Sequence, residues 1–317
     1  MTWDLVTDIG GTNMRVAQVE NGRILSRQDF PMTPDRKVAE TLRMVAEGLG
    51  GKPRAVVAAG AGPVKDRKIH LTNGGWLVGE EDIAHVTGAQ KVSVINDFEA
   101  AAWSLATLTD DDVRAVGQSG PLTSGHRVAV GPGTGLGVGS LIWDGHRYRV
   151  VPGEGGHVAV GPRTAQEVPV FEALCDLWPE ARFEGTITLE AEAMLSGTGL
   201  PWLYQACGGD AGVSGREIFE RATAGEPQAT LCAQIFRDHL AVMAGNLAVT
   251  LNATGGLFLV GGVAQANASL FDDAFYDVYK DGGRPAFTKL RSTCGIYLVT
   301  IEDFGLRGCI NALQQMI

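Results

Sequence analysis

Glu154 and His157 stand three residues apart in the stretch Pro152–His157, where three glycines leave little side-chain bulk around them. A glutamate accepts hydrogen bonds and a histidine both donates and accepts them, so the pair suits the neighbouring hydroxyls of a sugar. A zinc site would need a third Cys or His ligand nearby, and His126 and His146 are not obviously placed to supply it. A plain glycine turn explains the glycines but not the Glu and His among them, so we favour a polar ligand loop.

A second candidate is the carboxylate of Asp97, which follows the β-branched run Val92–Ile95 and Asn96. Ligands of open α/β sheets bind at the carboxyl ends of the strands, so Asp97 is a candidate general base on a substrate hydroxyl. Asp is also a favoured helix N-cap, and Ala-rich helical sequence at 98–105 follows directly. The two interpretations are compatible, because a helix start that Asp97 faces would also anchor its carboxylate.

Two turns that combine glycine with threonine, Gly10–Thr12 and Gly133–Gly135, each follow an apolar strand. Without side chains, backbone N–H groups can approach an anion closely, and the Thr hydroxyl adds a donor. Each turn alone suits a tight hairpin, but their repetition favours a pair of phosphate cradles. The sequence contains no P-loop, and neither turn has the G-x-G-x-x-G pattern that leads into the helix of a dinucleotide fold.

Three further acidic residues are candidates on weaker grounds. Asp8 heads the first turn, where it would hold Mg²⁺ directly or through water, or would cap its own turn. Glu190 and Glu192 lie on a predicted helix before Leu195–Gly199. Residues two apart on a helix point to different faces, so we expect at most one of them to face a site. For either one alone, a solvated helix charge is the better interpretation.

The elements that must position these residues repeat once along the chain. A strand, a Gly-Thr turn, a second strand, an Asx-Gly hairpin and a third strand occur in both halves, with strands at 5–7, 14–19, 24–30, 128–130, 138–143 and 148–151. The repeat predicts two related lobes, each offering a Gly-Thr turn to the space between them. Further strands are predicted at 55–59, 92–95, 257–260 and 296–299, and helices at 37–49, 228–251 and 304–316. The stripe of the 228–251 helix includes Leu231, Ile235 and Leu240.

Composition excludes several classes of function. With 317 residues, 45% hydrophobic and 20% charged, the chain is globular and suits two domains or one large one. A net charge of −10 argues against binding nucleic acid or an anionic membrane, but not against phosphate binding by backbone N–H groups. The five scattered cysteines are expected to be reduced thiols of a cytoplasmic protein. We expect neither a signal peptide nor a membrane span.

Taken in order, these motifs resemble the bacterial glucokinases, within the hexokinase/actin-like ATPase superfamily. The resemblance runs from Asp8 to the C-terminal helix and rests on Asp8–Asn13 with Arg15, Ile95–Phe98, Gly133–Gly137, Pro152–His157, Leu195–Leu200 and Gly261–Gly262. It implies a two-lobed α/β fold of the actin-like ATPase (ribonuclease H-like) type, with ATP in an interlobe cleft that closes on sugar binding. We expect a small domain of residues 1–108 plus 303–317 and a large domain of residues 109–302.

The resemblance also implies residue roles. Asp97 would be the catalytic base that takes the proton from the 6-hydroxyl of glucose. The other sugar ligands would be Asn73, Asn96, Glu154, His157 and Glu192; the last is preferred over Glu190 because the family's glutamate stands four residues before a Ser-Gly pair. ATP ligands would be Asp8, Gly10, Gly11, Thr12, Asn13, Gly133, Thr134, Gly261 and Gly262, with Asp8 also near Mg²⁺. The partners implied are glucose, ATP and a second copy of the chain in a cytoplasmic homodimer.

Two departures and three alternatives bear on this interpretation. A related family of repressors and kinases carries a cysteine-rich zinc motif after its own Glu-x-x-His, whereas Val158–Pro162 follows here, so no structural zinc is expected. Phe304 stands where a proline is expected before the last helix. The alternatives are a kinase of another hexose such as fructose or mannose, a polymerising or chaperone-like ATPase, and a non-catalytic sugar sensor of the same fold.

Overall fold

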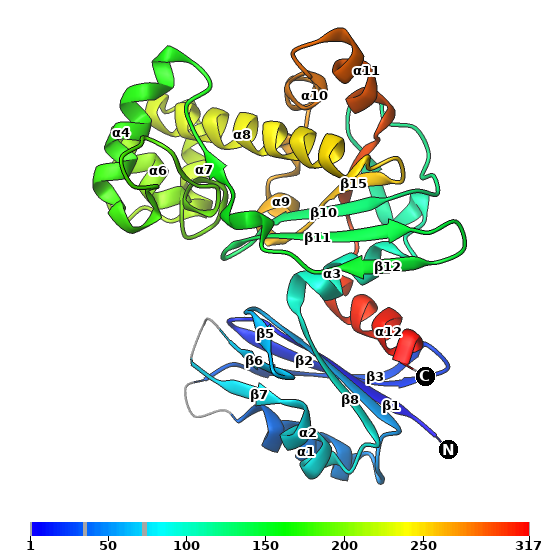
Figure 1. Ribbon diagram of the computed structural model, residues 1–317. Helices are drawn as coiled ribbons and strands as arrows, with labels where there is room; N and C mark the ends of the chain where they lie inside the picture. The colour runs from blue at the N-terminus through cyan, green and yellow to red at the C-terminus, as the bar shows by residue number, and fades with distance from the viewer. Residues whose placement is uncertain (1, 34–36, 72–74, 317) are drawn as a thin grey trace. The chain divides into compact units, whose positions relative to one another are not determined.

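The computed structural model describes residues 2–33, 37–71 and 75–316 (Figure 1). The chain divides into two compact units. The first comprises Met1–Leu108, Arg147–Pro152 and Ile301–Ile317, and the second comprises Thr109–His146 and Gly153–Thr300. Among the described residues, no helix has both the length and the apolar character needed to cross a membrane.

The first unit is built on a five-stranded sheet. Its order is β3 (Arg23–Pro31), β2 (Asn13–Glu20), β1 (Asp4–Ile9), β4 (Ala55–Gly60) and β8 (Lys91–Asn96). The first three strands run antiparallel, whereas β1, β4 and β8 run parallel. Asn21 and Gly22 both have positive φ, 50° and 75°, in the β2–β3 turn. These are the angles of the expected type I′ hairpin.

Helices cover both faces of this sheet (Figure 1). On one face α1 (Val38–Gly48) and α2 (Glu80–Thr87) pack against side chains such as Leu5 and Ile9. On the other face α3 (Asp97–Leu105) and α12 (Phe304–Met316) pack against side chains such as Val6. The sheet is therefore apolar on both sides, as parallel strands usually are. The unit also holds a small sheet of β5 (Val64–Lys65), β6 (Lys68–His70) and β7 (Leu77–Gly79), and the strand β12 (Tyr148–Val151).

The sheet of the second unit includes, in order, β11 (Leu136–Trp143), β10 (Arg127–Pro132), β15 (Gly256–Leu259), β16 (Ile296–Val299) and β9 (Val113–Ala115). Strands β10, β15 and β16 run parallel, with β11 and β9 antiparallel to their neighbours. A short ladder joins β13 (Ala159–Val160) to β14 (Leu189–Glu190). Both units thus combine a central set of parallel strands with an antiparallel strand pair that is joined by a Gly-Thr turn.

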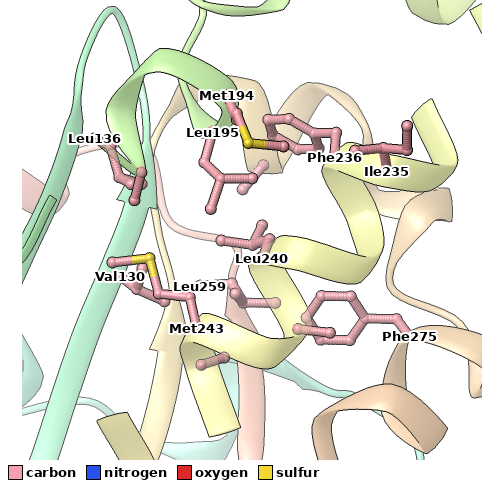
Figure 2. Close-up of a cluster of buried hydrophobic side chains, with 14 of the residues drawn as sticks. Val130, Leu136, Met194, Leu195, Ile235, Phe236, Leu240, Met243, Leu259 and Phe275 are labelled. Atoms are coloured by element: carbon pink, nitrogen blue, oxygen red, sulfur yellow. The ribbon is translucent and has the colours of Figure 1, made fainter. Parts of the chain in front are cut away.

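The core of the second unit forms between its sheet and α8 (Pro227–Leu251). Figure 2 shows Ile235, Leu240 and Met243 of this helix among buried side chains of the sheet and of α5 (Glu192–Leu195). The predicted helix is confirmed, but Leu231 is 41% exposed and does not belong to the buried stripe. The remaining helices are α4 (Val168–Leu177), α6 (Leu200–Ala206), α7 (Gly215–Thr223), α9 (Gly262–Ala266), α10 (Asp273–Lys280) and α11 (Pro285–Thr293).

Candidate functional site

In the first unit, the junction between β8 and α3 carries Asn96 and Asp97. Asn96 is the N-cap of α3: its Oδ1 accepts from the Phe98 N–H at 2.7 Å, and its Nδ2 donates to the Gly62 carbonyl at 2.9 Å. Asp97 is the first helical residue and is half-buried. The capping role considered for Asp97 therefore falls mainly on its neighbour. The helix start leaves the Asp97 carboxylate at the positive end of the helix dipole, which favours its ionised form.

Strand register brings the first Gly-Thr turn to the same sheet edge as Asp97. Ile9 at the end of β1 pairs with Gly60, and Gly60 pairs with Asn96. The three strands are parallel, so their carboxyl ends are aligned with only β4 between the turn and Asp97. Neighbouring strands lie about 4.8 Å apart, which places the two features roughly 10 Å from each other. A ligand lying across this edge would reach both.

The first turn is compact and exposed. The Gly10 N–H donates to the Asn13 carbonyl at 2.9 Å, and the Met32 N–H donates to the Thr12 carbonyl at 2.8 Å. Gly11, Thr12 and Asn13 are exposed. The turn is therefore closed by its own backbone and leaves the Thr12 side chain and the Gly11 backbone accessible to an anion.

Asp8 lies behind this turn and is held by an ion pair. Its Oδ2 accepts from Arg15 Nη1 at 2.8 Å, and its side chain is only 17% exposed. Burial raises the pKa of Asp8, and the charge and hydrogen bond of Arg15 partly offset that rise. Within the described residues, no backbone N–H of the turn donates to this carboxylate. Asp8 is thus positioned by Arg15, and by the close approach of Gly305 on α12, where a Cβ would lie 2.8 Å from its Cγ.

In the second unit, residues outside the turn Gly133–Gly135 hold it by hydrogen bonds. The Gly133 N–H donates to the Gly135 carbonyl at 2.8 Å, which closes the turn. The Gly197 N–H donates to the Gly133 carbonyl at 2.8 Å, and the N–H and hydroxyl of Thr198 donate to the Thr134 carbonyl at 3.1 and 2.9 Å. The predicted Ser-Gly motif at 196–199 therefore serves here as a support for the second turn.

Glu192 contacts the same turn from another side. Its Oε2 accepts from the Leu136 N–H at 2.8 Å, directly after the turn. A Cβ on Gly135 would lie 2.5 Å from this oxygen, so the glycine allows the carboxylate to approach. The predicted sugar ligand Glu192 is thus hydrogen-bonded to the backbone that leads out of a predicted phosphate cradle.

The Glu154–His157 loop lies against the same part of β11. Gly155–His157 forms a 3₁₀ turn in which the His157 N–H donates to the Glu154 carbonyl at 3.1 Å. Gly156 is buried, and a Cβ there would lie 1.8 Å from the Leu136 carbonyl oxygen. Glu154 and His157 are exposed on either side of this glycine. The glycine allows close contact with the strand, and the two polar side chains remain available to a ligand.

His157 is surrounded by carboxylates. Its Nδ1 lies 3.1 Å from Glu190 Oε2. The hydrogen bond to Glu190 raises the pKa of His157, and the negative charges of Glu192, Glu190 and Glu154 add to the rise while partial burial opposes it. With Nδ1 facing Glu190, the Nε2 atom is the one that remains for a ligand.

The expectation that Glu190 and Glu192 share a helix is wrong. Glu190 ends β14, where it pairs with Ala159, and only Glu192 begins α5. The change from strand to helix between them alters the directions of the two side chains, so both reach candidate site elements: Glu190 contacts His157, and Glu192 contacts the second turn. The contact of Glu190 was missed because the preference for Glu192 rested on its spacing from the Ser-Gly pair.

Gly261 and Gly262 follow the end of β15 and lie beside the second turn. The parallel partners Val130 and Leu259 align the carboxyl ends of β10 and β15. Gly261 has φ of 90°, and a Cβ there would lie 2.7 Å from the Pro132 carbonyl oxygen, so the position requires glycine. Gly262 begins α9. As in the first unit, the carboxyl edge of parallel strands gathers the candidate residues.

A pocket of about 700 Å³ opens from Gly197 and Gly262. It runs between α7 and α9, and its lining includes Leu200, Phe219, Thr223, Val263, Asn267 and Ser269. Its volume suits a nucleoside. Sequence reasoning predicted no binding residues here, because no polar motif marks the α7 face that forms the wall.

Two predicted features remain without structural support here. Asn73 lies outside the described residues. In the part of the chain that the structure describes, no group of three or more His, Cys, Asp or Glu could hold a metal ion. The Mg²⁺ site at Asp8 stays a prediction.

The family model and the similar sequences identify one family. The sequence model of the Glucokinase family matches residues 5–316. The glucokinase of Rhizobium johnstonii is 34% identical over 315 residues, which cover 96% of this chain and 89% of that protein. A glucokinase crystal structure from an Antarctic psychrotroph has a TM-score of 0.84 at 26% identity and covers 99% of both chains. The glucokinase of Balamuthia mandrillaris, solved with glucose, has a TM-score of 0.82 at 21% identity, covering 99% of this chain and 94% of that one. These likenesses confirm the predicted fold class.

Proposed function

We propose that this chain, which belongs to the glucokinase family and is an ATP-dependent glucose kinase, uses Asp97 as the general base on the 6-hydroxyl of glucose. The observation that carries the proposal is the place of Asp97, at the first residue of α3 and the carboxyl edge of three parallel strands. That edge is where open α/β sheets bind ligands, and the start of a helix is a favourable place for a negative charge.

The proposed reaction is a direct transfer. The 6-hydroxyl oxygen of glucose attacks the γ-phosphorus of ATP, the bond from that phosphorus to the β–γ bridging oxygen breaks, and the hydroxyl proton passes to Asp97. The products are glucose 6-phosphate and ADP. Positioning and charge stabilisation supply most of the rate enhancement of phosphoryl transfer. A positioned base adds a factor of about 10²–10⁴.

The sugar would be held by polar side chains. The candidates are Asn96, Glu154, His157 and Glu192, with Asn73 as a further one. The contact between His157 Nδ1 and Glu190 supports this assignment, because it directs the other ring nitrogen toward a ligand. Three glutamates near one histidine suit a ligand that is rich in hydroxyl donors.

The nucleotide would lie on the two Gly-Thr turns and in the pocket of the second unit. Asp8, Gly10–Asn13, Gly133 and Thr134 would face the phosphates, with Gly261 and Gly262 against the adenosine. The pocket beside Gly262 supports this assignment. Mg²⁺ suits a site with one protein carboxylate, because it keeps most of its water ligands, and Asp8 would hold it through water beside its ion pair with Arg15. When bound, Mg²⁺ neutralises charge on the transferred phosphate.

The wider setting is proposed from the family resemblance. Residues 1–108 plus 303–317 and residues 109–302 would form two domains that close on the sugar and exclude water from the γ-phosphate. The enzyme would act in the cytoplasm as a homodimer and supply glucose 6-phosphate to glycolysis.

A panel of hexoses with Mg²⁺-ATP tests the substrate. ADP release is measured in a coupled assay with glucose, fructose and mannose at equal concentrations. We expect the highest kcat/KM with glucose. A higher value with fructose or mannose would assign the enzyme to another hexose, and glucose binding without ADP release would identify a sugar sensor.

The variants Asp97→Ala and Asp97→Asn test the base. We expect kcat to fall by about 10²–10⁴-fold in both, with glucose affinity, measured by calorimetry, nearly unchanged. Glu99→Gln is the matched control, because Glu99 is a partly buried acid on the same helix with a pKa raised by burial. If the Asp97 variants keep near-wild-type kcat, another group is the base.

A further inference from the structure

The contact between His157 and Glu190 is built on a very short ladder. The two-stranded sheet of β13 and β14 pairs Ala159 with Glu190 and Val160 with Leu189, and His157 stands two residues before it. An isolated pair of strands is marginally stable at best in water, so this ladder depends on what lies around it. Under the proposed function, on which this inference rests, His157 binds the sugar. The segment that follows β13 therefore bears on the sugar site.

That segment is tied to the start of α4 by Glu167. Glu167 lies directly before the first residue of α4, and its side chain is 11% exposed. Its Oε2 accepts from the Arg163 N–H at 2.7 Å, and the Glu167 N–H donates to the Thr164 carbonyl at 3.1 Å. The carboxylate therefore closes the loop that leads from β13 into α4.

His239 of α8 gives that carboxylate a second hydrogen bond. Its Nε2 lies 2.9 Å from the same Oε2 atom of Glu167, and its side chain is 3% exposed. Although burial favours the neutral acid, the hydrogen bonds from His239 and the Arg163 N–H lower the pKa of Glu167. An ionised carboxylate only accepts, so Nε2 is the donor. Phe171, one turn further along α4, packs against the same imidazole, with ring centroids 5.4 Å apart.

Arg163 gives the same loop another contact with α8. Its Nη1 lies 3.2 Å from Asp238 Oδ2, while Asp238 Oδ1 accepts from Arg237 Nε at 2.8 Å. This ion pair is partly exposed and therefore weaker than a buried one. Asp238 and His239 are consecutive residues of a 25-residue helix whose side chains form much of the core. One point of α8 thus holds the loop at both Arg163 and Glu167.

We infer that Glu167 and His239 are positioning residues, which hold the end of β13 on α8 and thereby place His157 for the sugar. The chain of contacts runs from α8 through the carboxylate and the Arg163 N–H to the end of β13, and from there along the ladder to Glu190. Breaking a buried pair of this kind is costly, because the remaining partner is left unpaired away from water. The pair is therefore a fixed point for a ladder that is too short to be stable alone.

Steady-state kinetics with glucose and Mg²⁺-ATP give the first test. Glu167→Ala removes both hydrogen bonds and should raise glucose KM by about tenfold, a usual loss for a charged hydrogen bond, with kcat within about twofold of wild type. Glu167→Gln should restore most of the KM, because its side-chain oxygen still accepts from the Arg163 N–H and its amide can donate to the other tautomer of His239. Tyr279→Phe is the matched control for a general loss of stability. The buried Tyr279 hydroxyl donates to the Cys294 carbonyl at 2.7 Å in the same unit, and its removal should not change glucose KM.

The titration of His157, followed by NMR without sugar, is a second readout that a general loss of stability would not move. The hydrogen bond to Glu190 raises the pKa of His157, and the charges of Glu192 and Glu154 add to the rise while partial burial opposes it. In Glu167→Ala this pKa should fall toward the ordinary value of about 6.5. Glu167→Gln and Tyr279→Phe should leave it raised, and His157→Gln identifies the signal.

An unchanged pKa of His157 in Glu167→Ala would overturn the inference, as would equal increases of glucose KM in Glu167→Ala and Tyr279→Phe. Circular dichroism checks that each variant folds. If Glu167→Ala does not fold, Arg163→Met supplies both measurements, with smaller changes in the same direction because its pair with Asp238 is partly exposed; no change in either would overturn the inference. A lowered pKa of His157 with an unchanged glucose KM would support the inference and refute the proposed role of His157 in sugar binding.

Discussion

The two Gly-Thr turns occupy equivalent places in the two units, yet they are held in different ways. The first is closed by its own backbone, and Asp8 and Arg15 form an ion pair behind it. The second is also closed by its backbone, but it makes further hydrogen bonds to residues outside it. Gly197 and Thr198 donate to its carbonyl groups, and Glu192 accepts from the N–H group that directly follows it. The difference indicates that the second turn is coupled to the elements that carry predicted sugar ligands, whereas the first is not.

The largest effect is expected at Gly156, which packs against the strand that leaves the second turn. In Gly156→Ala the Cβ would lie 1.8 Å from the Leu136 carbonyl oxygen, a backbone atom that cannot rotate away. We expect the free energy of unfolding to fall by about 3 kcal/mol, at the upper end for overpacking, and glucose KM to rise. Urea unfolding and steady-state kinetics measure both. Gly153→Ala is the control, because a Cβ there meets no atom within 4 Å; equal effects of the two changes would show that the loop does not rest on the strand.

Glu192 tests the coupling itself. Glu192→Ala removes the acceptor of the Leu136 N–H, and we expect KM to rise about tenfold for both glucose and ATP, in line with the loss of a charged hydrogen bond. In Glu192→Gln the side-chain oxygen can still accept from that N–H, so the KM for ATP should recover more than the KM for glucose. An unchanged KM for ATP in the alanine variant would show that the second turn is not coupled to the predicted sugar ligand Glu192.

Asp8 tests the isolation of the first turn. Asp8→Asn removes the ion pair with Arg15 and the proposed Mg²⁺ ligand. We expect the Mg²⁺ concentration for half-maximal activity to rise by about tenfold or more, because losing one charged hydrogen-bond partner typically costs about 1.5–3 kcal/mol. Glucose KM should stay within about twofold of wild type, because the change is local to the first turn. Magnesium titrations at fixed ATP measure the first quantity. A glucose KM that rises as much as the Mg²⁺ requirement would contradict the contrast between the turns.

The smallest effect is the pH dependence of His157. The hydrogen bond that His157 donates to Glu190 raises the pKa of His157. The protonated pair is therefore fully present below the ordinary histidine pKa of about 6.5 and is lost as pH rises through the raised value. The two side chains are 46% and 41% exposed, so the effect on stability is small. We expect glucose KM to be constant in acid and to increase above the raised pKa. Glu190→Gln should move that transition to lower pH. A transition at the same pH as in the wild type would show that Glu190 does not raise the pKa of His157.

Local patterns predicted most of the elements. The alternation and the Asn21–Gly22 pair predicted the β2–β3 hairpin, and apolar periodicity predicted α8 and α12. These signals depend on turn chemistry and side-chain period, which neighbouring residues decide. The same holds for the Gly-Thr turns, whose glycines mark the abrupt end of an apolar strand. The position of Leu231 was not predictable in this way, because helix periodicity says which residues share a face but not how far the covering elements extend.

The residue types at the strand ends and the order of the motifs can be read from the sequence alone, and they are enough to indicate the family. The hydrogen-bond partner of each polar side chain depends on the tertiary structure. Asn96 rather than Asp97 became the cap because its amide also reaches Gly62. Glu190 reaches His157 across 33 residues because the β13–β14 ladder places it there. Hydrogen-bond partners depend on register and packing between distant segments, and residue spacing along the chain carries little information about either.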